Sequence, residues 1–155
     1  MVEATLDGVQ SLRAVNELFI GHRSHQTARY EISAPSAPIR GRPERQLSSG
    51  VIVSTGTGAT GWALAINRGL AEPLPLPAPA DEALAFFVRE VFPTLSSGSS
   101  LTRGVLGPSD CLELVSKMDG GGVVFGDGIE ADRLDFSWGR RLVVRISEQR
   151  LRLVG

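Results

Sequence analysis

Residues 48–66 read SSGVIVSTGTGATGWALAI and combine three kinds of local sequence. Residues 51–53 are a short apolar run of β-branched residues, which is typical of a strand. Residues 54–61 contain only glycine, alanine, serine and threonine, and residues 62–66 have the composition of a short helix. The stretch therefore predicts a strand, a loop and a helix in succession.

The loop at 54–61 has the composition of a ligand-binding segment. Its glycines, at 56, 58 and 61, carry no Cβ to block a close approach, and its hydroxyl groups can bond a polar ligand. If the helix begins near Thr60, its first N–H groups face the same space, which suits phosphate or ribose oxygens. We therefore expect a ligand site here; the alternative is a tight connection capped by threonine.

Two common phosphate-binding motifs do not account for this loop. Residues 56–61 match G-x-G-x-x-G, but a dinucleotide-binding βαβ unit needs a second parallel strand ending in an acidic residue about 20 positions on. Prolines at 73, 75, 77 and 79 occupy that place, and proline at every second residue cannot sit in a central strand. The Walker A loop is excluded because no lysine follows these glycines.

A longer match covers residues 49–62, which resemble the NAD kinase signature G-D-G-x-x-x-S-T-P-T-G-S-T-A-Y. Ser49-Gly50 falls on its D-G, and the aromatic position is Trp62. The loop matches S-T at 54–55, T-G at 57–58 and T at 60. The departures are Ser49 for Asp, Gly56 for Pro, Ala59 for Ser, Gly61 for Ala and Trp62 for Tyr. The Ser49 change removes a carboxylate from a binding position.

A second match lies upstream, where Asn16-Glu17 interrupts apolar residues. NAD kinases carry an N-E pair in this position, and there the two side chains face the ribose of the substrate. The residues alone are equally compatible with an exposed strand face. Downstream, Asp127-Gly128 resembles a D-G turn of the family, and we interpret it as a structural hairpin turn.

The resemblance implies the substrate-binding part of an NAD kinase-like enzyme, with NAD or a related dinucleotide as ligand. The loop would be the adenine- and ribose-facing wall, and Trp62 would cover a base by stacking. The implied substrate-binding residues are Asn16, Glu17, Ser49, Thr57, Thr60, Gly61 and Trp62.

No catalytic residue is expected in this chain. The G-G-D-G motif of the separate N-terminal α/β domain of the family does not occur here, so we expect the chain alone to be inactive. The full enzyme would use Mg²⁺ and ATP or polyphosphate to phosphorylate the 2′-hydroxyl of NAD. Two alternatives stay open: a related sugar or lipid kinase domain, and a non-catalytic module for nucleotide binding or assembly.

Composition excludes several other classes. A formal net charge of −1 gives no positive field to hold a nucleic acid or an anionic membrane. No apolar run approaches the length of a membrane helix, and the N-terminus lacks the pattern of a secretory signal. We therefore expect a cytoplasmic protein that binds neither nucleic acid nor membrane, and a homo-oligomer as the resemblance implies.

The cysteine and the two histidines of the sequence predict neither a disulfide nor a metal site. Cys111 is the only cysteine, so an intramolecular disulfide and a thiolate metal cluster are excluded, and we expect a small strand residue. His22 and His25 are spaced H-x-x-H without a companion Cys or acidic ligand at metal spacing. We interpret both as loop residues and expect no metal site.

The remaining pattern predicts one mainly β domain over 1–155, sandwich-like, with a short helix after the glycine-rich loop. Two proline-rich segments, 34–46 and 69–80, are expected to be loops. Polar loops or turns are expected at 7–8, 95–103, 107–110, 119–122, 126–128, 138–140 and 148–150. Strands are expected within 12–21 and at 27–33, 51–53, 81–92, 111–118, 123–125, 134–136, 141–146 and 151–154.

Overall fold

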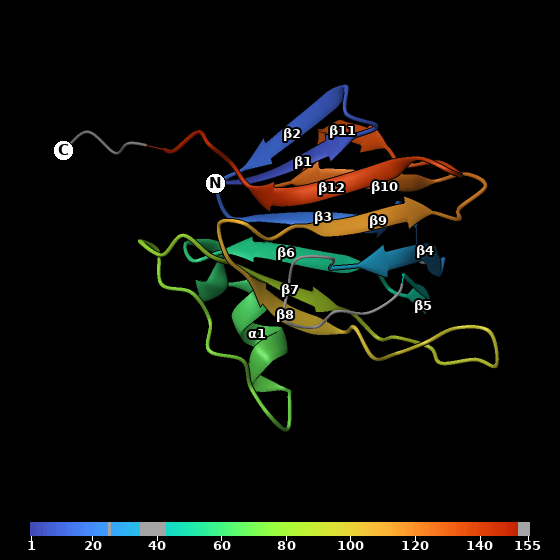
Figure 1. The fold of residues 1–155 in the computed structure, drawn as a ribbon, viewed down its shortest axis with the longest axis horizontal. Helices are drawn as coiled ribbons and strands as arrows, with labels where there is room; N and C mark the ends of the chain where they lie inside the picture. The colour runs from blue at the N-terminus through green and yellow to red at the C-terminus, as the bar shows by residue number, and fades with distance from the viewer. Residues whose placement is uncertain (25, 35–42, 152–155) are drawn as a thin grey trace.

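The computed structural model describes residues 1–24, 26–34 and 43–151. Within them, the chain forms two six-stranded antiparallel sheets, one 3-10 turn and one short helix. Figure 1 shows the helix standing at one end of the molecule, beside β7 and β8.

The first sheet has the order β2-β1-β12-β9-β4-β5. Strands from the beginning and the end of the described chain, β1 and β12, are neighbours in it. In sheet order its strands are β2 (Gln10–Ala14), β1 (Val2–Leu6), β12 (Arg141–Ile146), β9 (Leu112–Ser116), β4 (Ala28–Ser33) and β5 (Glu44–Ser48).

The second sheet has the order β11-β10-β3-β6-β7-β8 and carries the candidate site. Strand β6 lies inside it, paired with β3 on one side and β7 on the other. In sheet order its strands are β11 (Ile129–Asp135), β10 (Gly122–Gly126), β3 (Glu17–His22), β6 (Val51–Thr55), β7 (Leu84–Val88) and β8 (Arg103–Leu106).

The main core lies between the two sheets and follows the two-residue period of a strand. On β3, Leu18 and Ile20 point into this core, together with Val51 and Val53 of β6. Fully burying an aliphatic or aromatic side chain contributes roughly 1.5–3 kcal/mol, and the core takes such residues from both sheets.

The opposite, outer face of the second sheet is only partly covered. Helix α1 (Trp62–Arg68) packs Ala63 against Ala85 and Phe87 of β7. Beside it, Phe19 of β3 and Ile52 of β6 belong to a separate apolar cluster. Because β6 and β7 are covered on both faces, every residue in them is buried, which explains their continuous apolar sequence.

The prediction of a mainly β fold with one short helix after the glycine-rich loop is confirmed. The expected hairpin turns at Asp7-Gly8 and Asp127-Gly128 are present, with positive φ at all four residues (52°, 71°, 52° and 72°). This is the left-handed conformation that Asp-Gly turns adopt between antiparallel strands.

Several predicted element bounds were wrong. Segment 34–46 was expected to be a loop, but Glu44 begins β5. Gln46 is completely buried, and its side-chain amide donates to the Leu101 carbonyl at 2.9 Å. This strand therefore buries a polar side chain, which its sequence does not indicate. The part of that segment at 35–42, with Arg40 and Arg42, lies outside the described residues.

Smaller differences concern strand ends. Arg103 was expected in a loop but begins β8. His22 is the last residue of β3 and not a loop residue, Cys111 lies one residue before β9, and β11 begins at Ile129. Of the strand expected at 151–154, Leu151 is not in a strand and the rest lies outside the described residues, as does His25. No helix in the described ranges is long and apolar enough to span a membrane.

Candidate ligand-binding site

The glycine-rich loop connects β6 to α1 as the sequence predicts, but most of its glycines serve the packing of the chain. A Cβ at Gly56 would stand 1.9 Å from the Ala78 carbonyl oxygen, and one at Gly58 would stand 2.2 Å from the Asn16 carbonyl oxygen. Protein backbone therefore fills the space that we expected to be open to a ligand. Only Gly61 keeps an open side, with its nearest atom, the Gly58 oxygen, at 3.7 Å.

The helix begins at Trp62, as the composition of residues 62–66 predicts, so the condition of a start near Thr60 is not met. A 3-10 turn (Gly58–Thr60) follows β6, and α1 begins at Trp62. The Thr60 hydroxyl donates to the Thr57 carbonyl at 3.1 Å, which stabilises this turn. Since α1 spans only seven residues, its dipole is short.

The structure brings the Asn-Glu pair directly against this loop. Thr55, the last residue of β6, donates its N–H to the Asn16 carbonyl at 2.8 Å, and its hydroxyl lies 2.7 Å from the Val15 carbonyl oxygen. From the other side, the Asp127 carboxylate accepts the N–H groups of Val15, Asn16 and Glu17 at 2.8, 2.7 and 3.2 Å. The β2–β3 connection is therefore held between β6 and the Asp127 turn.

This arrangement leaves three polar side chains unpartnered. Within the described chain, the Asn16 amide, the Glu17 carboxylate and the Thr57 hydroxyl form no hydrogen bond to the protein. Glu17 begins β3 on the same face as Phe19, two residues on, which is the outer face of the sheet. Burial, and then the nearby Asp127 carboxylate, raise the pKa of Glu17 above its ordinary value.

Trp62 lies on the outer face within an aromatic cluster. Its ring stacks on Phe19 with 6.1 Å between centroids and 6° between planes, and the Arg89 guanidinium lies 5.0 Å from its centroid. Phe125 packs against Phe19 at 5.1 Å. Trp62 is 39% exposed, so part of the ring can contact a ligand.

The structure does not bring Ser49 together with Asn16 and Glu17. Ser49 precedes β6, whereas Asn16 contacts the end of β6 at Thr55, so about 17 Å of strand separates them at roughly 3.3 Å per residue. The Ser49 hydroxyl donates to the Glu90 carboxylate, and its N–H donates to the Arg89 carbonyl at 2.9 Å. A carboxylate therefore lies beside position 49 even though the residue itself is serine.

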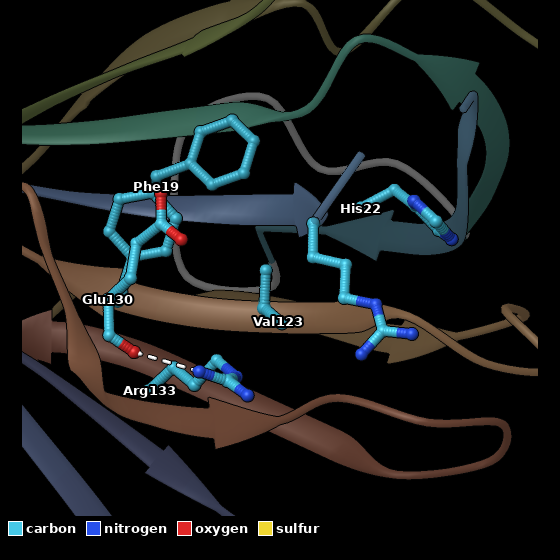
Figure 2. A pocket seen from close by; sticks show the side chains of 7 residues that line it. Phe19, His22, Val123, Glu130 and Arg133 are labelled. Atoms are coloured by element: carbon cyan, nitrogen blue, oxygen red, sulfur yellow. Dashed lines mark hydrogen bonds between the residues drawn. The ribbon is translucent and has the colours of Figure 1, made fainter. Parts of the chain in front are cut away.

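A pocket on the outer face contains none of the residues singled out from the signature. It measures about 320 Å³ and opens over β3, β10 and β11, beside the aromatic cluster (Figure 2). Its lining residues are Phe19, His22, Arg23, Val123, Phe125, Glu130 and Arg133.

Sequence reasoning missed three kinds of residue at the site. Asp127 was interpreted only as a turn residue, and its contacts with a segment 110 or more positions away left no sequence signal. Glu90 and the pocket arginines stand in stretches without a motif. In the described ranges, no three His, Cys, Asp or Glu side chains gather in a way that would hold a metal ion.

The chain has the fold of the C-terminal domain of NAD kinases. No family model matches it. In sequence it is similar to mitochondrial NAD kinase 2 of Rattus norvegicus, 41% identical over 71 residues, and of Homo sapiens, 42% identical over 67 residues. These matches cover 45% and 43% of this chain, and only 16% and 14% of the relatives.

In structure the chain is similar to an NAD kinase from Archaeoglobus fulgidus in complex with ATP, with a TM-score of 0.65 and 20% identity. It is also similar to yeast NADH kinase complexed with NADH, with a TM-score of 0.64 and 22% identity. These alignments cover 96% and 93% of this chain but 51% and 39% of the solved chains. The chain thus corresponds to about half or less of those proteins.

Proposed function

We propose that this chain is the dinucleotide-binding domain of an NAD kinase-like enzyme, with NAD held against the Asn16-Glu17 pair and the loop at 57–61. The observation that carries the proposal is the fixed position of the pair. Asp127 and Thr55 hold its backbone on both sides, while its two side chains have no partner in the described chain. Polar groups held rigid and left unpaired are suited to bind a ligand.

The chemistry of these side chains fits a nucleoside. A carboxylate accepts hydrogen bonds from a ribose diol, and an amide both donates to and accepts from a base or sugar. Glu17 and Asn16 supply these two groups, and the exposed hydroxyl of Thr57 adds a third. Thr60 and Gly61 line the same exposed surface of the loop.

Ser49 and Trp62 extend this surface along the sheet. The Trp62 ring lies over Phe19 and is contacted by Arg89, whose carbonyl accepts the Ser49 N–H. An elongated ligand could follow this line from Asn16 past Trp62 toward Ser49 and Glu90. A dinucleotide has that shape, whereas a single sugar would contact one end only.

The transfer reaction itself needs groups beyond those described here. The full enzyme would use ATP or polyphosphate with Mg²⁺, and such chemistry depends on a bound metal and on positioning. The acidic side chains of this site do not fit a metal: the Asp127 oxygens are occupied by three backbone N–H groups, and no ligand group gathers elsewhere in the described ranges. We assign the binding of the phosphoryl donor and of the metal to a separate α/β domain. We also propose that the protein is a cytoplasmic homo-oligomer.

The serine at 49, where the NAD kinase signature has aspartate, also favours a second candidate, a non-catalytic module for nucleotide binding or assembly. A sugar or lipid kinase domain is the third possibility of the same superfamily. Calorimetric titration of the 155-residue chain with NAD, NADH, glucose and diacylglycerol in detergent micelles separates the dinucleotide proposal from a sugar or lipid kinase domain and from a pure assembly module. The proposal requires saturable binding of NAD or NADH and none of the other two. Binding of glucose or diacylglycerol alone would contradict it.

A further inference from the structure

The pocket on the outer face has a feature that the dinucleotide proposal does not use: two unpaired guanidinium groups over an aromatic floor. Arg23 follows β3 and Arg133 lies in β11, and both line the pocket. Neither forms an ion pair with any described residue. The Arg133 guanidinium donates only to the Glu130 carbonyl, at 3.2 Å, which leaves most of its donors available.

A β-bulge builds this pocket. In β11, Leu134 pairs with Val124, but Ile129 pairs with Gly126, so the register shifts between these two points. In a regular strand, Glu130 and Arg133 would point to opposite faces. The shift turns both toward the outer face, as Figure 2 shows, and bulges commonly re-aim side chains in this way.

The floor of the pocket is apolar and rigid. Val123 is 3% and Phe19 9% exposed, and Phe125 packs on Phe19 with centroids 5.1 Å apart. The Phe19 ring lies over Gly21 and Gly50, where an added Cβ would come within 2.7 and 2.8 Å of ring carbons. Such a floor accepts a flat apolar group without rearrangement.

We propose that this pocket binds a nucleoside monophosphate as a second ligand, separate from the site at Asn16 and Glu17. The base lies on the Phe125 and Val123 floor, and the Glu130 carboxylate accepts hydrogen bonds from ribose hydroxyls. The phosphate lies between Arg23 and Arg133, since paired guanidinium groups bind phosphate with directed hydrogen bonds. A volume of about 320 Å³ lies at the small end of the range for small-molecule sites.

The test is calorimetric titration of the 155-residue chain with AMP, adenosine and inorganic phosphate. AMP should bind saturably and at least tenfold more tightly than adenosine or phosphate alone. Arg23→Gln and Arg133→Gln should each weaken AMP binding by about ten- to a hundredfold, because each removes charge-assisted hydrogen bonds. Arg133→Lys, which keeps the charge but loses the planar fork, should give an intermediate loss.

Two controls separate this pocket from the proposed dinucleotide site. Arg145→Gln removes an exposed arginine of β12 in the other sheet and should leave AMP binding within about twofold of the parent chain. Amide NMR signals of Val123 and Phe125 should shift on adding AMP. AMP affinity unchanged by both pocket substitutions, or AMP-induced shifts confined to Asn16 and the loop at 57–61, would overturn the inference, as would phosphate binding as tightly as AMP.

Discussion

Replacing Asp127 by asparagine tests how the Asn16-Glu17 pair is held. The carboxylate accepts three successive backbone N–H groups, from Val15 on one oxygen and from Asn16 and Glu17 on the other. Asparagine keeps the shape and tolerates the positive φ of 52° at this position. It offers one oxygen only, so its NH₂ group must face at least one of the three donors.

One buried or half-buried donor left without a partner costs about 1–3 kcal/mol. For a domain of this length, that corresponds to a fall in Tm of about 3–9 °C. The amide hydrogens of Val15, Asn16 and Glu17 should also exchange faster, because their acceptor is weakened. The measurements are a thermal melt and hydrogen exchange followed by NMR.

Asp132→Asn is the matched control, since Asp132 is an exposed residue of β11. It should leave the Tm within about 1 °C, as surface substitutions usually change stability by no more than ~0.5 kcal/mol. If Asp127→Asn melts with the parent chain and its three amides keep their exchange rates, Asp127 does not hold the pair.

The other predictions concern pH, packing and activity. Because burial and Asp127 raise the pKa of Glu17, this group stabilises the fold below the ordinary pKa of 4.5, and that contribution is lost as the pH rises through the raised pKa. Glu17→Gln should therefore raise the Tm at pH 7 relative to the parent, with the difference vanishing below about pH 4; an equal gain from Glu148→Gln would argue against this cause. Gly58→Ala, whose Cβ would meet the Asn16 carbonyl at 2.2 Å, should cost about 1–3 kcal/mol of unfolding free energy. Gly120→Ala, which meets nothing within 4 Å, should melt close to the parent, and equal melting of the two variants would show that the loop is not tightly packed. The 155-residue chain with NAD, ATP and Mg²⁺ should form no NADP, and product formation that a point substitution in this chain abolishes would contradict the assignment of catalysis to another domain.

The sequence allowed the fold class to be predicted because its signals are local. The apolar run at 51–53 and the Asp-Gly turns follow directly from strand and turn preferences. Strand β5 escaped prediction because Glu44 and Gln46 read as surface residues, whereas their partners, Ser100 and Leu101, lie more than fifty positions away. Long-range hydrogen bonds of this kind leave no periodic pattern.

The sequence identified the candidate residues, but their geometry could not be predicted from it. The signature pointed to Asn16, Glu17 and the loop, which the structure brings together. It gave no reason to expect that the Asn16 backbone would occupy the space beside Gly58. It could not show that Asp127 would reach the pair, or that the β11 register shift would build a pocket, because both depend on how distant strands align.

The most direct test of the central proposal is the affinity for NAD of the Asn16→Ala, Glu17→Ala and Thr57→Val variants, measured by calorimetry beside thermal melts of the same samples. Removing a ligand hydrogen bond costs about 0.5–1.5 kcal/mol, or about 1.5–3 kcal/mol when one partner is charged. We expect each variant to bind NAD roughly three- to a hundredfold more weakly than the parent chain, with no fall in Tm. Variants that lose stability but bind NAD as the parent does once folded would show that the pair and the loop are structural, and would contradict the account.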